Sequence, residues 1–262
     1  MNYKDEIKHT VSKSIESFFL NKKVTVSHPL DLIFPKERRI RSLIGGLETS
    51  LGTKVWEPLA KMFAQNNGFE VLDEKELNAS VLRIPEDVMH KLSDFENKKL
   101  NNPALPHSLY KKEIADFISM KNIKPNERRK MPKGEGVDVW LKKDGQELLI
   151  DIKTVQLNAG GGPKFNKNLL KWYTFRALEL SEHANTRCML AFPFNPHKKD
   201  YWKKEGGKIL PLIFSEEALV GNEFWDLLSG ETNTLELILD AFREMGEENF
   251  GNQFDYIFRI DD

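Results

Sequence analysis

The dipeptide Asp144-Gly145 constrains the fold of this chain more than any other feature, because it separates two apolar segments, 136–141 and 147–153. Glycine accepts the positive φ that a two-residue hairpin turn demands, and Asp-Gly between apolar segments is a strong signal for such a turn. A turn at this dipeptide sets the register of the two strands, and that register pairs Asp138 with Asp151. We therefore predict an antiparallel hairpin that brings these two carboxylates together.

The hairpin also places a lysine beside the two acids. Side chains alternate along a strand, so Asp151 and Lys153 share one face. Directly opposite residues have Cβ atoms about 5 Å apart, and like charges in that position are destabilising. A divalent cation relieves this repulsion most simply, and Mg²⁺ takes one or two carboxylates together with water and phosphate oxygens.

This chemistry assigns a role to each residue of the patch. We predict that Asp138 and Asp151 are catalytic metal ligands and that the backbone carbonyl of Ile152 is a further ligand. Lys153 would stabilise charge on a phosphate or position the attacking water. The predicted cofactor is Mg²⁺.

An acidic pair on a solvated hairpin face, without any chemistry, is the alternative interpretation. The apolar run Leu148-Leu149-Ile150 directly precedes Asp151. Neighbours this apolar are typical of a buried central strand, in which unpaired charges are costly and tend to be functional. The run therefore favours a functional site.

Asp138, a gap of twelve residues and then Asp151-Ile152-Lys153 resemble the signature of the PD-(D/E)xK nucleases, with Val137 in place of the usual proline. Further stretches extend the similarity over most of the chain: 34–48, Trp56–Ala60, Glu223–Trp225 and Gly230-Glu231. Together they resemble type II restriction endonucleases of the TdeIII type. The resemblance implies Mg²⁺-dependent cleavage of double-stranded DNA by a homodimer, at a short palindrome of the GGNCC kind.

The resemblance also points to a third acid. Many nucleases of this superfamily place a helical acid near the metal, and Glu57, on a helix predicted over 50–65, is the matching catalytic candidate. Glu48 is the alternative. Without the resemblance, a glutamate on such a helix would be interpreted as a solvated residue.

A basic segment leads into the predicted hairpin. Residues 121–133 contain six bases and one acid. Phosphate contacts from such a segment give affinity without sequence choice, and a plain solvated loop is the alternative. The candidates for contact with the DNA backbone are Arg128, Arg129 and Lys130.

The segment after Lys153 carries three consecutive glycines, 160–162, which permit close approach of a ligand to the backbone. It lacks the Gly-Lys-Ser/Thr end of a P-loop, so we expect no nucleotide cofactor. Its amide and amine side chains suit base edges in the major groove, although in loops such residues are more often ordinary surface. The candidates for base recognition are Gln156, Asn158, Lys164 and Asn166.

The net charge of −1 does not by itself suggest a DNA-binding protein, but the charges are unevenly distributed. Residues 215–262 hold 13 acids and two bases, a net of −11, which leaves +10 on the remaining residues and allows a basic groove. The single cysteine, Cys188, suits a reducing compartment. With no apolar stretch of about 18 residues and no apolar core of a signal peptide, we expect a cytoplasmic protein without a membrane span.

The order of predicted elements indicates an α/β fold, with a restriction-endonuclease-like mixed central sheet flanked by helices. We expect one nuclease domain over 1–262 with a helical insertion at about 85–122, and the last two strands at 187–194 and 208–214. Two other functions remain open: a structure-selective DNA repair or recombination nuclease, and a non-catalytic DNA-binding protein on the same scaffold.

Overall fold

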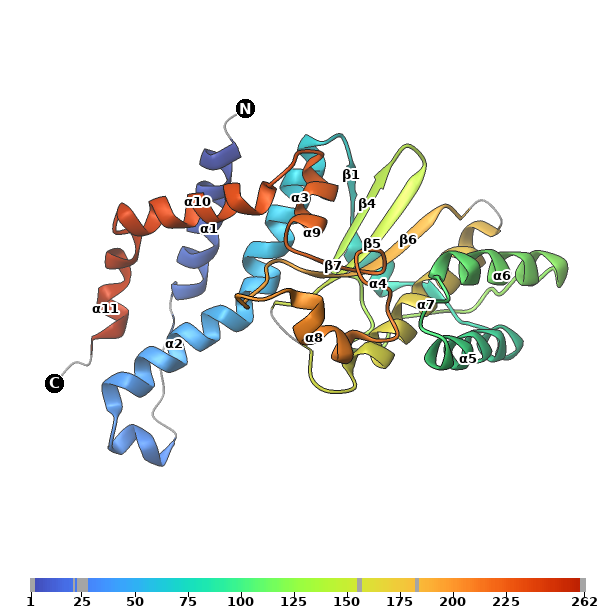
Figure 1. Cartoon of the computed structure of the whole chain (residues 1–262), viewed down its shortest axis with the longest axis horizontal. Helices are drawn as coiled ribbons and strands as arrows, with labels where there is room; N and C mark the ends of the chain where they lie inside the picture. The colour runs from blue at the N-terminus through green and yellow to red at the C-terminus, as the bar shows by residue number, and fades with distance from the viewer. Residues whose placement is uncertain (1–2, 21, 23–27, 155–156, 182–183, 260–262) are drawn as a thin grey trace.

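The computed structural model describes residues 3–20, 22, 28–154, 157–181 and 184–259. Figure 1 shows a central sheet with helices packed around it, and a group of helices from both ends of the chain at one side of the molecule. Among the described residues, no helix is both long and apolar enough to cross a membrane.

Five strands form the central sheet in the order β1-β4-β5-β6-β7. Strand β4 pairs antiparallel with both β1 and β5, whereas β6 and β7 run parallel to β5. The predicted mixed α/β fold is therefore confirmed. The strands of this sheet are β1 (Glu70–Leu72), β4 (Val139–Lys143), β5 (Gln146–Ile152), β6 (Thr186–Phe192) and β7 (Ala218–Val220). A separate two-stranded sheet joins β2 (Val81–Leu82) to β3 (Arg128–Arg129).

The hairpin of β4 and β5 forms with the predicted turn and register. Asp144 and Gly145 have φ values of 49° and 77°, and positive φ at both central residues is the mark of a type I′ turn. Lys143 pairs with Gln146, and Val139 pairs with Ile150 at the far end of the ladder. Continuing this register by one residue sets Asp138 opposite Asp151.

Alternation along β5 divides the core between the two faces of the sheet. Leu149 packs into one cluster with helices α5 (Glu86–Asn101), α6 (His107–Met120), α7 (Gly161–Leu180) and α8 (Tyr201–Ile209). Leu148 and Ile150 pack into the other, with α1 (Tyr3–Phe19), α3 (Glu57–Asn66), α9 (Asn222–Ser229) and α10 (Thr234–Glu247). The sheet is therefore buried on both faces, as the apolar run of β5 indicated.

The remaining helices flank this core. The short helix α4 (Glu74–Ala79) follows β1. Helix α2 (Pro35–Leu51) continues through a π-helical turn, η2 (Gly52–Trp56), directly into α3. A third small cluster joins Phe19 of α1 and Leu43 of α2 to the C-terminal segment. The other short helices are η1 (Pro29–Leu32), η4 (Phe250–Phe254) and α11 (Asp255–Phe258).

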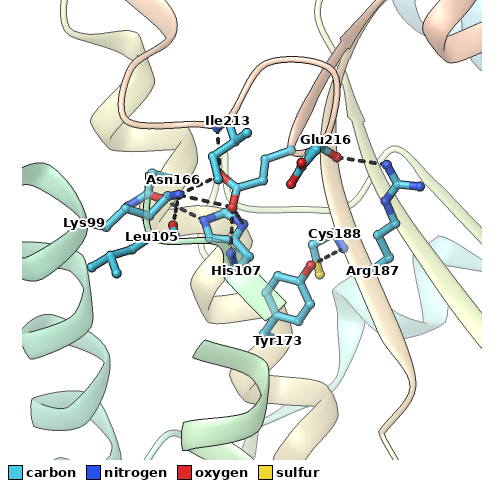
Figure 2. Close-up of polar contacts among 10 residues, drawn as sticks. Lys99, Leu105, His107, Asn166, Tyr173, Arg187, Cys188, Ile213 and Glu216 are labelled. Carbon is cyan, nitrogen blue, oxygen red and sulfur yellow. Dashed lines mark hydrogen bonds and ion pairs between the residues drawn. The ribbon is translucent and has the colours of Figure 1, made fainter. Parts of the chain in front are cut away.

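A buried polar network holds α5 and α6 in place (Figure 2). The Lys99 ammonium lies 2.8 Å from Oε2 of Glu217, and that carboxylate also accepts hydrogen bonds from the backbone amides of His107 and Ile213. The His107 ring contacts Asn166 of α7 at 2.8 Å, and burial lowers the pKa of His107 to about 4. The helical pair is thus packed into the body of the protein rather than attached loosely to it.

The strand predicted at 208–214 is wrong. These residues form the last turn of α8 and the loop that follows it, and the fifth strand is β7 at Ala218–Val220 instead. Pro211 has no N–H to give to a sheet ladder, which disfavours a central strand at this point. The backbone amide of Ile213 is bound by Glu217 rather than by a neighbouring strand.

Candidate active site

Asp138, Asp151 and Lys153 converge on one face of the sheet. Leu149 faces the cluster beneath α7, so Asp151, two residues further along β5, faces the same side. Trp140 packs against that cluster too, which places Asp138, two residues before it, on this face. Lys153 forms an ion pair with Asp151, and its Nζ lies 5.0 Å from the centre of the Phe165 ring of α7.

The two aspartates are held in place by the backbone and by each other. The Ile152 amide donates a hydrogen bond of 2.8 Å to Oδ2 of Asp138, which ties the start of β4 to the end of β5. The two carboxyl groups interact directly, and Asp151 is only 3% exposed. Oδ1 of Asp151 is buried and, apart from its ion pair with Lys153, accepts no hydrogen bond from the described residues.

This environment opposes ionisation of both aspartates. The pKa of Asp151 is raised to about 6, chiefly by burial and also by the charge of Asp138, because the Lys153 ammonium only partly offsets these effects. Burial also raises the pKa of Asp138, against the effects of Lys153 and of the Ile152 amide. One buried and one half-buried carboxyl group with one nearby ammonium form a site that favours additional positive charge.

Glu57 joins this cluster from α3. The residue begins α3 directly after the π-helical turn, and such turns are frequent at functional sites. The pKa of Glu57 is raised to about 7, chiefly by burial and also by the charge of Asp138, against the opposing charges of Lys61 and Lys153. Glu48, the alternative from the sequence, is exposed on α2.

Glu74 is an acid of this cluster that the sequence did not single out. It forms a 2.8 Å ion pair with Lys61, and its charge acts on both Glu57 and Asp138. No motif marked it, because its place here depends on how α4 packs against α3. The ion pair leaves Lys61 less able to neutralise Glu57.

The charges of the cluster suit a divalent cation. When all are ionised, the four acids (Glu57, Glu74, Asp138 and Asp151) exceed the two lysines (Lys61 and Lys153) by two negative charges. Within the described part of the chain, no three His, Cys, Asp or Glu side chains are arranged to hold an ion by themselves. Mg²⁺ fits such a site, because it often takes only one or two carboxylates and completes its shell with water and substrate phosphate.

The predicted base-reading residues fall into different environments. Lys164 is exposed at the start of α7, and its charge lowers the pKa of Asp151, so it lies near this carboxyl group. Asn158 is exposed in the loop before α7, and Gln156 lies outside the described residues. Asn166 is fully buried against His107 and cannot reach a base edge in this structure, which corrects the prediction.

The basic segment before the hairpin includes β3. Arg128 forms a 2.8 Å ion pair with Glu179 and donates to the carbonyl of Ser80, so its guanidinium is already engaged. Arg129 and Lys130 are exposed. These two residues remain the better candidates for contact with phosphates.

In the run of glycines at 160–162, Gly162 is required for close packing of two backbone segments. A Cβ on Gly162 would lie 2.1 Å from the carbonyl oxygen of Leu210, so the segment after α8 approaches the start of α7 too closely for any side chain. Gly160, with φ of 79°, adopts the left-handed conformation directly before the helix. At Gly162 the close approach is to the chain's own backbone rather than to a ligand.

Comparisons with known proteins place the chain in a family. The chain matches the family model of the type II restriction endonuclease HinfI over residues 2–246. It is 25% identical over 222 residues to the type II restriction enzyme MjaII of Methanocaldococcus jannaschii, covering 81% of this chain and 56% of that enzyme. It is 27% identical over 113 residues to the type II restriction enzyme HgiEI of Herpetosiphon aurantiacus, covering 42% and 39%.

The chain thus spans about half the length of these relatives or less, and no solved structure matches it. The family match covers residues 2–246, which include the β4–β5 hairpin with Asp138, Asp151 and Lys153, and also Glu57. It confirms the resemblance to type II restriction endonucleases seen in the sequence. The chain belongs to the HinfI family of type II restriction endonucleases.

Proposed function

We propose that this protein is a Mg²⁺-dependent endonuclease that cleaves double-stranded DNA at a short palindrome. The observation that carries the proposal is the convergence of Asp138, Asp151 and Lys153 on one face of the sheet, in a chain of this family. The proposal includes a homodimer, since cutting both strands of a palindrome calls for two active sites related by a two-fold axis. It also includes a single nuclease domain with α5 and α6 as a helical insertion, acting in the cytoplasm.

The roles of the residues follow from their charges and positions. Asp138 and Asp151 would hold the cation together with the backbone carbonyl of Ile152. When bound there, Mg²⁺ supplies positive charge for the phosphate and lowers the pKa of a bound water. Lys153 can donate hydrogen bonds to the attacking water or to a non-bridging phosphate oxygen. Glu57, whose pKa is about 7, can accept or release a proton near neutral pH.

Contacts with DNA are proposed on the side from which Lys164 approaches the catalytic centre. Lys164, Arg129 and Lys130 would bind the phosphate backbone, because they are exposed cations. Asn158 and Gln156 remain proposed readers of base edges. A site of the GGNCC kind is the first sequence to test.

The experiment is digestion of plasmid DNA with Mg²⁺ by the wild-type protein and by Lys153→Ala. We expect discrete fragments from the wild type and a rate at least about 100-fold lower from the variant, because the lysine stabilises charge in the transition state. DNA affinity, measured by fluorescence anisotropy in Ca²⁺, should change little. Lys142→Ala is the matched control, since Lys142 is an exposed lysine on the same hairpin.

Sequencing the ends of the fragments then gives the recognised bases and the cleavage position. A ladder without sharp bands would instead indicate a structure-selective nuclease. Intact plasmid at every salt concentration tested, while fluorescence anisotropy still shows that the protein binds DNA, would indicate a DNA-binding protein without catalysis. Full activity in Lys153→Ala would remove the lysine from the mechanism.

Glu57 is tested by replacing its carboxylate with an amide. Glu57→Gln keeps the size of the side chain and removes its charge, so we expect the cleavage rate at pH 8 to fall about ten- to a hundredfold. Glu70→Gln serves as the control, because Glu70 is exposed on the edge strand β1, and this variant should cleave at the wild-type rate. Equal loss in both variants would contradict the assignment of Glu57.

A further inference from the structure

Helix α2 exposes a row of side chains that a monomer leaves without a partner. Lys36, Ile40, Ile44 and Glu48 follow one another at intervals of four residues, and residues at this spacing form a ridge along one face of a helix. Ile40 and Ile44 are each 38% exposed, and Lys36 and Glu48 are exposed as well. Neither Lys36 nor Glu48 forms an ion pair within the described residues.

The stripe of α2 next to this ridge is already occupied. Leu43 is fully buried against Phe19 of α1 and against Phe254 and Ile257 of the C-terminal segment. Ile40 and Ile44 lie at the edge of this buried stripe and remain partly exposed. Figure 1 shows α2 extending away from the sheet, with the C-terminal helix α11 beside it.

The exposed apolar surface continues into the segment before α2. Leu30, Leu32, Ile33 and Phe34 are all exposed, and Leu32 reaches 83%. Monomeric proteins rarely leave apolar patches larger than a few hundred Å² in contact with water, and larger ones mark interaction sites. The ridge and this segment together have the character of an interface.

The order of residues along the ridge indicates that its binding partner is a second copy of the same chain. In an antiparallel pair of such ridges, Ile40 meets the partner's Ile44, and Lys36 meets the partner's Glu48. Each base then faces an acid and each isoleucine an isoleucine, and the two-fold axis repeats every contact. An interface between two identical chains has this property, because residue i contacts residue j and residue j contacts residue i.

We propose that this ridge, with the apolar segment before it, is the surface by which two copies of the chain dimerise. DNA is a poorer occupant, since isoleucines cannot neutralise phosphates and Glu48 would repel them. The proposal rests on the proposed function for its biological purpose, which is to pair two cleavage sites. The physical contact itself requires neither DNA nor metal.

Because the ridge is close to Glu57 in sequence, dimerisation through it would set the distance between the two active sites. Helix α2 runs through the π-helical turn into α3, where Glu57 is the first residue. Two α2 helices packed together would set the distance between the two Glu57 side chains. The geometry of α2 would therefore determine the separation of the two cleaved phosphates.

The first test measures the oligomeric state by sedimentation velocity, without DNA or Mg²⁺. We expect the full chain to sediment as a dimer at micromolar concentration. The double variant Ile40→Glu/Ile44→Glu should weaken the dimer at least about 100-fold, because it places four charges in the centre of the interface. Ser42→Glu is the matched control, since Ser42 is exposed but lies on another side of α2.

The second test uses charge reversal to check the pairing itself. Lys36→Glu alone sets two acids against each other at both ends of the interface, and Glu48→Lys alone sets two bases there. Each should weaken the dimer about five- to tenfold, since the dimer contains two such pairs. The combination Lys36→Glu/Glu48→Lys should restore wild-type dimerisation. Residues twelve positions apart on one helix do not touch, so this rescue can come only from contacts between chains.

Three results would overturn the proposal: a wild-type monomer both alone and with duplex DNA in Ca²⁺, a dimer that persists in Ile40→Glu/Ile44→Glu, or a charge-reversal pair that shows no rescue. Circular dichroism confirms that each variant is folded. Failure here is distinguishable from failure of the nuclease proposal, because sedimentation reports no cleavage. A Lys153→Ala dimer that binds DNA without cutting it would separate the two functions.

Discussion

Replacing Asp151 by asparagine should make the metal-free protein more stable while it abolishes cleavage. The carboxylate is buried beside Asp138, and Lys153 is the only cation that forms an ion pair with it among the described residues. Asparagine has nearly the same shape and carries no charge. The substitution therefore removes an electrostatic penalty without opening a cavity.

The magnitude follows from the pKa of Asp151. Burial raises it from an ordinary value of 3.8 to about 6, and the opposing effect of Lys153 is already contained in that value. A pKa difference of this size corresponds to about 2–3 kcal/mol of folding free energy when the group is ionised. We expect Asp151→Asn to increase the free energy of unfolding by about that amount at pH 8.

The sign can be checked against pH. A carboxyl group whose pKa is raised on folding binds more protons in the folded state, so it lowers stability as the pH rises from 3.8 to 6. The advantage of Asp151→Asn should therefore be complete above pH 6, about half as large near pH 5, and absent below pH 3.8. This trend is the opposite of the one expected from a stabilising surface ion pair.

The assay is urea unfolding in EDTA at pH 8 and pH 5, followed by tryptophan fluorescence. Asp144→Asn is the matched control, because it makes the same chemical change at an exposed position of the same hairpin whose positive φ asparagine tolerates. Mg²⁺ should stabilise the wild type and not Asp151→Asn, since a ligand that binds only the folded state raises its stability. A variant that is less stable than the wild type at pH 8 would refute the reasoning.

Two further predictions concern the packing around the site. Lys99→Met should lower the free energy of unfolding by about 3–5 kcal/mol, because it leaves the Glu217 carboxylate buried without its ammonium partner, whereas Lys98→Met on the exposed side should change it little. Urea unfolding of both variants measures the difference, and equal values would contradict the buried ion pair. Gly162→Ala should lower the thermal midpoint and cost about 1–3 kcal/mol, since its Cβ would meet a carbonyl oxygen at 2.1 Å, whereas the Cβ in Gly207→Ala has open space. Calorimetry that finds both alanine variants equally stable would show that the start of α7 can move aside.

The hairpin and the pairing of its acids could be predicted because they depend on residues that are close in sequence. Positive φ at Asp144 and Gly145 is a local requirement of the turn. Once the turn is placed, alternation along the two strands brings Asp138, Asp151 and Lys153 to one face. No contact from a distant segment is needed for this result.

The incorrect predictions involve burial by segments that are distant in sequence. Asn166 has a side chain suited to base recognition, but α6 packs His107 against it. The apolar run at 208–214 has the composition of a strand, but it ends α8 and crosses over the start of α7, where Gly162 makes room for it. The composition of a segment indicates whether its side chains can be buried, but it does not specify which distant segment packs against them.

By itself, the sequence determined the mixed fold, the register of the hairpin and the placement of Asp138, Asp151 and Lys153 on one face, because turn chemistry and strand alternation act over a few residues. Only the tertiary structure decided that Glu57 rather than Glu48 faces the aspartates, that Glu74 and Lys61 join them, and that the ridge of α2 remains exposed. These arrangements depend on the packing of helices brought together from separate parts of the chain. That packing depends on how much apolar surface the whole chain buries, and this cannot be read from any short segment.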